Sequence, residues 1–185
     1  MKELFEAIRA GDLSRVAALV EADPSLAIFA ATIQGETARV EQLLAANRSL
    51  TSALSTDGWT ALHLAAFFGM EPTARLLLNR GAVVNARSTN PMRNTPLHAA
   101  AAGRHAALVK LLIDHGANVN AQQHGGWAPI HAVAQNGDVE SATALVAAGA
   151  DVQVRADNQQ RAIDLALTGG KQAMVEFLEA HGASL

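Results

Sequence analysis

The chain has no cysteine and no tyrosine, and only 4% of its 185 residues are aromatic. Without cysteine, neither a disulfide framework nor a thiolate zinc site can form. No apolar run is long enough to cross a membrane. The opening segment MKELFEAIRAGDLSR interleaves charges where a secretory signal needs a continuous apolar stretch. These absences lead us to expect a cytoplasmic protein that does not associate with membranes.

The scarcity of aromatic residues also bears on the fold class. Half of the residues are hydrophobic, and 40 of them are alanine. Alanine costs no side-chain entropy in a helix, whereas sheets favour aromatic and β-branched residues. A charged fraction of 17% and a mean hydropathy of +0.13 argue against disorder. The composition therefore predicts a helical, closely packed protein and not a large β-sandwich.

The net charge of −3 provides no overall attraction to nucleic acid, but the charge is unevenly distributed. Residues 1–71 carry 5 basic and 9 acidic side chains, and residues 114–185 carry 3 and 8. Residues 72–113 carry 6 basic side chains and no acidic one: Arg75, Arg80, Arg87, Arg93, Arg104 and Lys110. Either this basic belt is ordinary solvated charge, or Arg87, Arg93 and Arg104 attract a partner with an acidic patch.

An internal repeat is the strongest pattern in the sequence. Similar segments begin at Thr60, Thr95, Ala128 and Arg161, at offsets of 35, 33 and 33 residues. Each has an apolar stretch, a turn, a second apolar stretch and a glycine. These glycines keep one register, at Gly81, Gly116, Gly149 and Gly182. A period of this length indicates stacked supersecondary units, none of which can bury its apolar face alone.

The segments TPLHAAAAG and GANVNA resemble the ankyrin repeat, whose pattern runs T-P-L-H-x-A and ends in G-A-D-V-N-A. The resemblance covers nearly the whole chain. It implies an all-α repeat solenoid of stacked helix–turn–helix units joined by β-hairpin or turn fingers. We expect one domain, 1–185, in six units: an N-terminal capping pair (1–25), a degenerate repeat (26–56), a repeat (57–87), a repeat with a longer finger (88–122), a repeat (123–155) and a C-terminal capping repeat (156–185).

Several residues fit structural positions of such a unit. Thr60 and Thr95 are suited to cap a helix N-terminus, and His63, His98 and His131 stand three residues after the cap position, as in a capping box. Gly81, Gly116 and Gly149 are placed to end the second helix.

Three departures from the pattern predict local differences. Ala128 and Arg161 replace the threonine cap, so we expect those helix starts to be weaker by about 0.5–2 kcal/mol each. Arg104 stands where the glycine between the two helices normally falls, so we expect an altered turn there.

No residue pattern indicates an active site, a cofactor or a metal. His63, His98 and His131 are expected on successive helices about 8–10 Å apart, whereas zinc ligands lie about 2 Å from one ion. The remaining histidines, His105 among them, are expected at solvated turns and helix ends. Nucleophile elbows, phosphate-binding loops and carboxylate pairs with acid–base spacing are missing. We expect a protein that is not an enzyme.

The family resemblance implies a binding face made of the finger tips and the exposed side of each first helix. Carried over by position, and with two residues of the long finger added, the candidate partner-binding residues are Trp59, Phe67, Phe68, Met92, Arg93, Trp127, Gln135 and Asn136. Tryptophan, phenylalanine, methionine and arginine are enriched at interface centres. The alternative is structural: each tryptophan covers a neighbouring finger, and one phenylalanine fills the space beside the next helix.

The favoured interpretation is a non-catalytic module that binds another protein, as a monomer or weak homodimer. An inhibitor or immunity-type protein that masks a partner enzyme is one alternative, and homodimerisation through the aromatic patch is another. A designed scaffold is less consistent with the irregular units. The sequence does not identify the partner, because one scaffold serves many targets.

Overall fold

The computed structural model describes residues 1–183, and within them the chain forms twelve α-helices with three short 3-10 turns. In chain order they are α1 (Lys2–Ala10), α2 (Leu13–Ala22), η1 (Pro24–Leu26), α3 (Ala27–Ile33), α4 (Thr37–Ala46), η2 (Arg48–Thr51), α5 (Ala61–Phe68), α6 (Glu71–Asn79), α7 (Pro96–Gly103), α8 (Ala106–Asp114), η3 (His124–Gly126), α9 (Pro129–Asn136), α10 (Val139–Ala147), α11 (Ala162–Thr168) and α12 (Gln172–Ala180). The last two residues of the proposed unit 156–185 lie outside this description.

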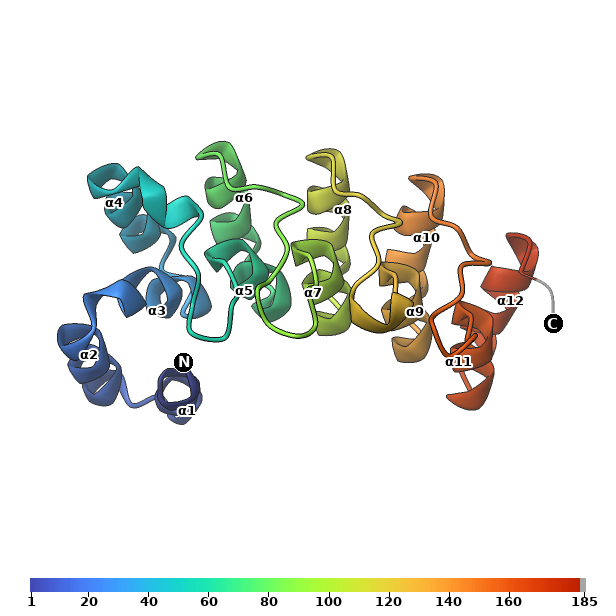
Figure 1. Cartoon of the computed structure of the whole chain (residues 1–185), viewed down its shortest axis with the longest axis horizontal. Helices are drawn as coiled ribbons and strands as arrows, with labels where there is room; N and C mark the ends of the chain where they lie inside the picture. The colour runs from blue at the N-terminus through green and yellow to red at the C-terminus, as the bar shows by residue number, and fades with distance from the viewer. Residues whose placement is uncertain (184–185) are drawn as a thin grey trace.

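The helices form an elongated stack of antiparallel pairs. Figure 1 shows one row made of α3, α5, α7, α9 and α11, and beside it a second row that includes α4, α6, α8 and α10. Loops connect each second helix to the next first helix and lie along one side of the stack. The prediction of an all-α repeat solenoid is therefore confirmed.

The fingers are turns and not ladders of paired strands. The described part of the chain contains one isolated β-bridge, between Leu54 and Thr60. Each finger is closed by a backbone bond such as that from the Ser55 N–H to the Trp59 carbonyl, 2.8 Å long. Neighbouring fingers are also joined: the His124 N–H donates to the Met92 carbonyl at 2.8 Å. The finger side is thus a connected backbone surface.

Alanine allows the first-row helices to approach closely. Ala65 and Ala66 on α5, Ala100 on α7 and Ala134 on α9 are completely buried in the stack. Their single methyl groups leave room for neighbouring backbones, while leucines such as Leu77 fill the space between the rows. This packing accounts for a core with few aromatic residues.

The capping threonine and histidine form a local network at each first helix. The backbone N–H of Thr60 donates to Nδ1 of His63 at 3.3 Å, and the His63 N–H donates back to Thr60 Oγ1 at 3.4 Å. Thr95 and His98 repeat the first bond at 3.3 Å. Ala128 lacks the hydroxyl, but its N–H still donates to His131 Nδ1 at 3.0 Å. The unit that begins at Ala128 therefore keeps one of the two hydrogen bonds of the capping box.

The same histidines hold consecutive units together. Nδ1 accepts a hydrogen bond from the cap backbone N–H, so Nε2 carries the ring hydrogen and donates to a carbonyl of the next finger. These bonds run from His63 to Asn94 at 3.1 Å and from His98 to Trp127 at 3.0 Å. Burial outweighs these bonds and lowers the pKa of His63 and of His98 to about 4, so both rings are neutral at pH 7.

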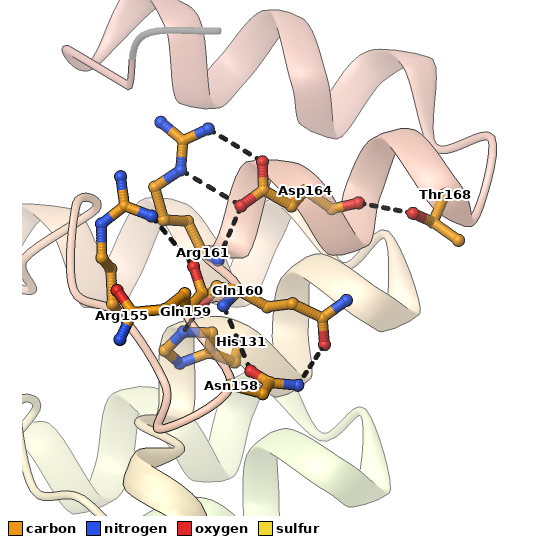
Figure 2. A network of polar contacts seen from close by, with 8 residues as sticks. All are labelled: His131, Arg155, Asn158, Gln159, Gln160, Arg161, Asp164 and Thr168. Carbon is orange, nitrogen blue, oxygen red and sulfur yellow. Dashed lines mark hydrogen bonds and ion pairs between the residues drawn. The ribbon is translucent and has the colours of Figure 1, made fainter.

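The last unit replaces this network with an ion pair (Figure 2). The backbone N–H of Arg161 donates to Asp164 Oδ2 at 2.8 Å, and its guanidinium Nη2 donates to Oδ1, also at 2.8 Å. The hydrogen bonds from Arg161 lower the pKa of Asp164. His131 of the preceding unit still reaches this finger, at the Gln160 carbonyl, 3.3 Å away. The carboxylate thus caps α11 in place of a histidine.

The expectation of an altered turn at Arg104 is wrong. Arg104 has φ 62° and ψ 41°, close to Gly69 (79°, 19°) and Gly137 (72°, 27°) at the equivalent turns. The turn is therefore kept, and an arginine occupies a left-handed conformation that favours glycine. Gly103 is required for a different reason, because a Cβ there would lie 2.4 Å from the Phe67 carbonyl oxygen.

His105, next to this turn, is also not simply solvated. It is half-buried, and its Nε2 lies 3.0 Å from the Phe67 carbonyl oxygen of the preceding unit. The ring therefore adds a second bond between units, at the opposite end of the first-row helices from the fingers.

Candidate functional site

The described structure has an apolar pocket near its N-terminal end, which we call the N-terminal pocket. Its volume is about 630 Å³, within the range of binding cavities in proteins. Its walls come from α1, α3, α5 and two fingers. The lining residues are Phe5, Ile8, Arg9, Ile33, Asp57, Trp59, Leu64, Phe67, Phe68 and Asn90.

The position of α1 makes this pocket possible. Leu4 and Ala7 are buried in the core, whereas Phe5 and Ile8, one residue further along the helix in each case, are half-buried. The Phe5 ring packs against Phe68 of α5, with centroids 5.8 Å apart. At the start of the helix, the Met1 nitrogen donates to Thr56 Oγ1 in the finger at 3.1 Å. Helix α1 thus forms a wall that faces α5.

A second depression, the central groove, adjoins the N-terminal pocket. It has a volume of about 260 Å³ and lies between the fingers and helices α5, α7 and α9. Trp59, Met92 and Trp127 all line it, so three successive fingers contribute one large apolar side chain each. The other lining residues are Phe67, Asn94, His98, Ala99, Ala102, Gln123, Ala128, His131, Ala132 and Gln135.

Trp59 and Phe67 line both depressions and join them into one surface, which we call the groove surface. Their rings meet edge to face with centroids 5.5 Å apart, and Trp59 also stacks on the neutral His63 ring at 5.9 Å. Phe67 lies between Trp59 and Phe68, whose ring centroid is 5.2 Å away. The aromatic side chains of α5 and its finger therefore form a continuous cluster.

Two polar atoms in this surface lack partners within residues 1–183. They are the indole Nε1 of Trp59 and the amide Oδ1 of Asn94, and both are buried. Burying an unpaired polar group costs about 1–3 kcal/mol. The fold therefore leaves one donor and one acceptor unsatisfied beneath the central groove, within two residues that line it.

The other candidate residues lie in different surroundings. Gln135 lines the central groove, and Met92 is 48% exposed at its edge. Asn136 is half-buried and donates from Nδ2 to the Ala101 carbonyl at 3.1 Å, which ties α9 to α7. Arg93 is exposed on the long finger, outside both depressions, with φ 51°.

Three of the six residues of the basic belt form ion pairs, one within its own helix and two with a neighbouring unit. Arg75 pairs with Glu71 at 2.9 Å, Arg80 pairs with Glu41, and Lys110 pairs with Glu140. Arg87 instead donates from Nη1 to the carbonyls of Arg93 and Gln122, at 3.2 and 2.9 Å. It therefore links its own finger to the next one. Among the six belt residues, only Arg93 and Arg104 have no ion pair or side-chain hydrogen bond with another described residue.

The sequence pattern did not predict that Phe5, Ile8, Arg9 and Ile33 belong to a site. A usable signal was present in α1. Its apolar stripe contains four side chains, those of Leu4, Phe5, Ala7 and Ile8. Two of them, Leu4 and Ala7, are enough to cover the neighbouring helix pair. Which of the four face the core depends on how α1 packs, and that is a tertiary property.

The described residues contain no group of three or more histidine, aspartate or glutamate side chains arranged to hold a metal ion. None of the helices within residues 1–183 is both long and apolar enough to cross a bilayer.

The sequence of the chain is similar to those of known repeat proteins. A family model for ankyrin repeats (three copies) matches residues 4–88 and 83–156. Tyrosine-protein kinase Shark of Drosophila melanogaster is 35% identical over 149 residues, which is 80% of this chain and 16% of the kinase. Putative ankyrin repeat protein FPV031 of Fowlpox virus is 32% identical over 130 residues, 68% of this chain and 38% of that protein.

A further relative, ankyrin repeat domain-containing protein 37 of Bos taurus, is 37% identical over 102 residues, 55% of this chain and 64% of that protein. The chain spans less than half the length of the kinase and of the viral protein. Ankyrin repeats generally mediate protein–protein interaction and are typically non-catalytic, although some are parts of kinases. The stacked helix pairs, the finger turns and the match over residues 4–156 agree, and the chain belongs to the ankyrin-repeat family.

Proposed function

We propose that the chain is a non-catalytic module that binds another protein through the groove surface. The observation that carries this proposal is that Trp59 and Phe67 join two apolar depressions into one surface on the finger side. Phe67 is 37% exposed and Met92 48% exposed, so large apolar side chains lie in contact with solvent. An apolar patch with polar residues around it is typical of a protein interaction site.

A protein partner suits the apolar character of the surface. Side chains of a partner would cover the aromatic cluster of Trp59, Phe67 and Phe68. Burial of such residues dominates binding energy at interface centres.

Two finer points belong to the same proposal. The six units of the sequence analysis remain our proposed division of the chain, with helix pairs α5/α6 to α9/α10 as its regular part. A cytoplasmic setting, proposed from the absence of cysteine, suits a module of this kind.

Affinity purification with quantitative mass spectrometry tests this proposal. The wild type is compared with Trp59→Ala and Phe67→Ala, and with Leu54→Ala as a control. Leu54 is 46% exposed and does not line either depression. Each groove variant should weaken binding of the recovered partner by about 2 kcal/mol or more, and the control by much less. A partner that binds all four proteins equally would contradict the proposal. If the chain only associates with itself, its mass in a sedimentation experiment should depend on its concentration.

A further inference from the structure

The N-terminal pocket differs from the rest of the groove surface because α1 contributes one wall. Phe5 and Ile8 line it from α1, facing Leu64, Phe67 and Phe68 of α5. A helix that only capped the end of the stack would need to bury Leu4 and Ala7 alone. The apolar side chains that α1 presents to the pocket are additional to that role.

Arg9 is the one basic side chain among the described residues that line this pocket. It lines the pocket from the last turn of α1, is exposed, and has no ion pair or side-chain hydrogen bond with another described residue. By contrast, Arg15 lies 3.6 Å from Glu3, and three basic residues of the belt are paired with glutamates. The charge of Arg9 is therefore available to a partner.

Asp57 supplies the one carboxylate among the described residues that line the pocket. It follows Thr56, which contacts the start of α1. Arg9 lies eight residues after Met1, which corresponds to about 12 Å along a helix. The opposite charges thus lie toward the two ends of α1, and the pocket is polarised along that helix.

We propose that the N-terminal pocket receives a protein segment with one or more bulky apolar side chains and with a carboxylate that pairs with Arg9. This inference rests on the proposed function and adds the chemistry of the partner to it. The apolar side chains enter between Phe5, Ile8 and Phe67. The carboxylate lies at the end of the pocket away from Asp57, since that aspartate repels an acidic group. Helix α1 thereby selects the partner and sets the direction in which it lies.

The test is selection from a phage-displayed library of random linear peptides on the whole chain. Parallel selections use Arg9→Glu and, as a matched control, Arg48→Glu. Arg48 is also an exposed arginine, but it lies in η2 and does not line the pocket. Retained peptides are synthesised, and their affinities for each variant and for Phe67→Ala are measured. Far-ultraviolet circular dichroism and urea denaturation establish that each variant is folded.

The expected peptides combine bulky apolar residues with aspartate or glutamate. Their affinity should fall about tenfold or more with Arg9→Glu, because the acidic group then meets a like charge, and should stay within about twofold with Arg48→Glu. Selection on Arg9→Glu should replace the acidic residues with lysine or arginine.

Two negative results have different meanings. Peptides that require Phe67 but have the same affinity for the wild type and Arg9→Glu would overturn this inference and leave the proposed groove surface intact. A library with no peptide that requires Phe67 would contradict the use of the groove surface itself, and the inference would fail with it.

Discussion

The imidazole Nε2 of His63 donates to the carbonyl oxygen of Asn94, 3.1 Å away and 31 residues later in the chain. This bond joins the first helix of one unit to the finger of the next. The ring is fully buried, and burial lowers its pKa to about 4. The same ring also accepts from the cap of its own helix. One side chain thus connects helix capping to the stacking of units.

This relationship predicts a fall in stability at mildly acidic pH. In the unfolded chain the histidine pKa is near 6.5, whereas His63 and His98 in the fold titrate near 4. The unfolded state therefore binds more protons between these values, and the free energy of unfolding decreases as the pH falls from about 6.5 to 4. By pH 5 the loss should be about 2 kcal/mol for each of the two histidines.

Urea denaturation at pH 7.5, 6 and 5 measures this loss. The matched variant is His98→Gln, which should be less stable at pH 7.5, because the bond to Trp127 is lost, but should depend less steeply on pH. Equal pH slopes for the two proteins would show that His98 does not titrate as its burial requires.

Restoring the missing hydroxyl at Ala128 should stabilise the protein. Thr95 occupies the same register and is as buried as Ala128, at 2% exposed in both cases, so the fold has room for threonine. Ala128→Thr should raise the free energy of unfolding by about 1 kcal/mol, because the hydroxyl accepts from the His131 N–H.

Arg161→Thr is the contrasting variant. Arg161 already forms the ion pair with Asp164, and threonine would remove it, so no gain is expected there. Chemical denaturation midpoints of both variants check this pair of outcomes. An unchanged midpoint for Ala128→Thr would mean that His131 alone caps α9 sufficiently.

The left-handed residue at Arg104 predicts a second stabilising change. Arg104→Gly should raise the free energy of unfolding by about 1 kcal/mol, because glycine adopts this conformation without strain. No described partner of the Arg104 side chain is lost in the process. Thermal unfolding measures the gain, and a lower melting temperature would refute the strain argument.

The adjacent glycine should behave in the opposite way. A Cβ at Gly103 meets the Phe67 carbonyl oxygen at 2.4 Å, which is backbone and cannot rotate away. Gly103→Ala should therefore destabilise the protein by about 2 kcal/mol or more. Similar stabilities for Gly103→Ala and the wild type would mean that α5 and α7 can separate without cost.

Phe67 and Phe68 should differ in their contributions to stability. Phe68 is half-buried and packs on Phe5, so it links α5 to α1. Phe68→Ala should cost about 2 kcal/mol, part of the loss seen for a fully buried phenylalanine. It should also speed amide exchange in residues 2–10. Phe67→Ala, at a more exposed position, should cost less than about 1 kcal/mol.

Amide hydrogen exchange followed by mass spectrometry measures the effect on α1. Unchanged exchange in residues 2–10 of Phe68→Ala would show that the Phe5–Phe68 contact does not hold α1 in place. That result would also weaken the case for α1 as a wall of the N-terminal pocket.

Local chemistry and periodicity were sufficient to predict the repeat. The spacing of Thr60, Thr95 and Ala128, with glycines at a constant register, predicts helix pairs that must stack. Glycine, threonine and proline act on their own backbone or within one helical turn, so their effects can be predicted from sequence. The abundance of alanine likewise predicts close packing.

Contacts between units depend on the three-dimensional arrangement. The basic belt was visible in the sequence, but the pairing of three of its residues with Glu41, Glu71 and Glu140 was not predicted. Two of these pairs join residues 30 or more positions apart. Similarly, the sequence does not reveal that Arg104 keeps a glycine-like turn, because its left-handed conformation is set where α7 and α8 meet.

By itself, the sequence determined the family and the helical repeat. It also indicated which aromatic residues the core does not require. The tertiary structure decided which of them meet. It placed Phe68 against Phe5, brought Trp59 and Phe67 into both depressions, and turned Phe5, Ile8 and Arg9 toward the N-terminal pocket. The physical reason is that periodicity specifies which side chains share a helix face, whereas a pocket requires faces from several helices and fingers at once.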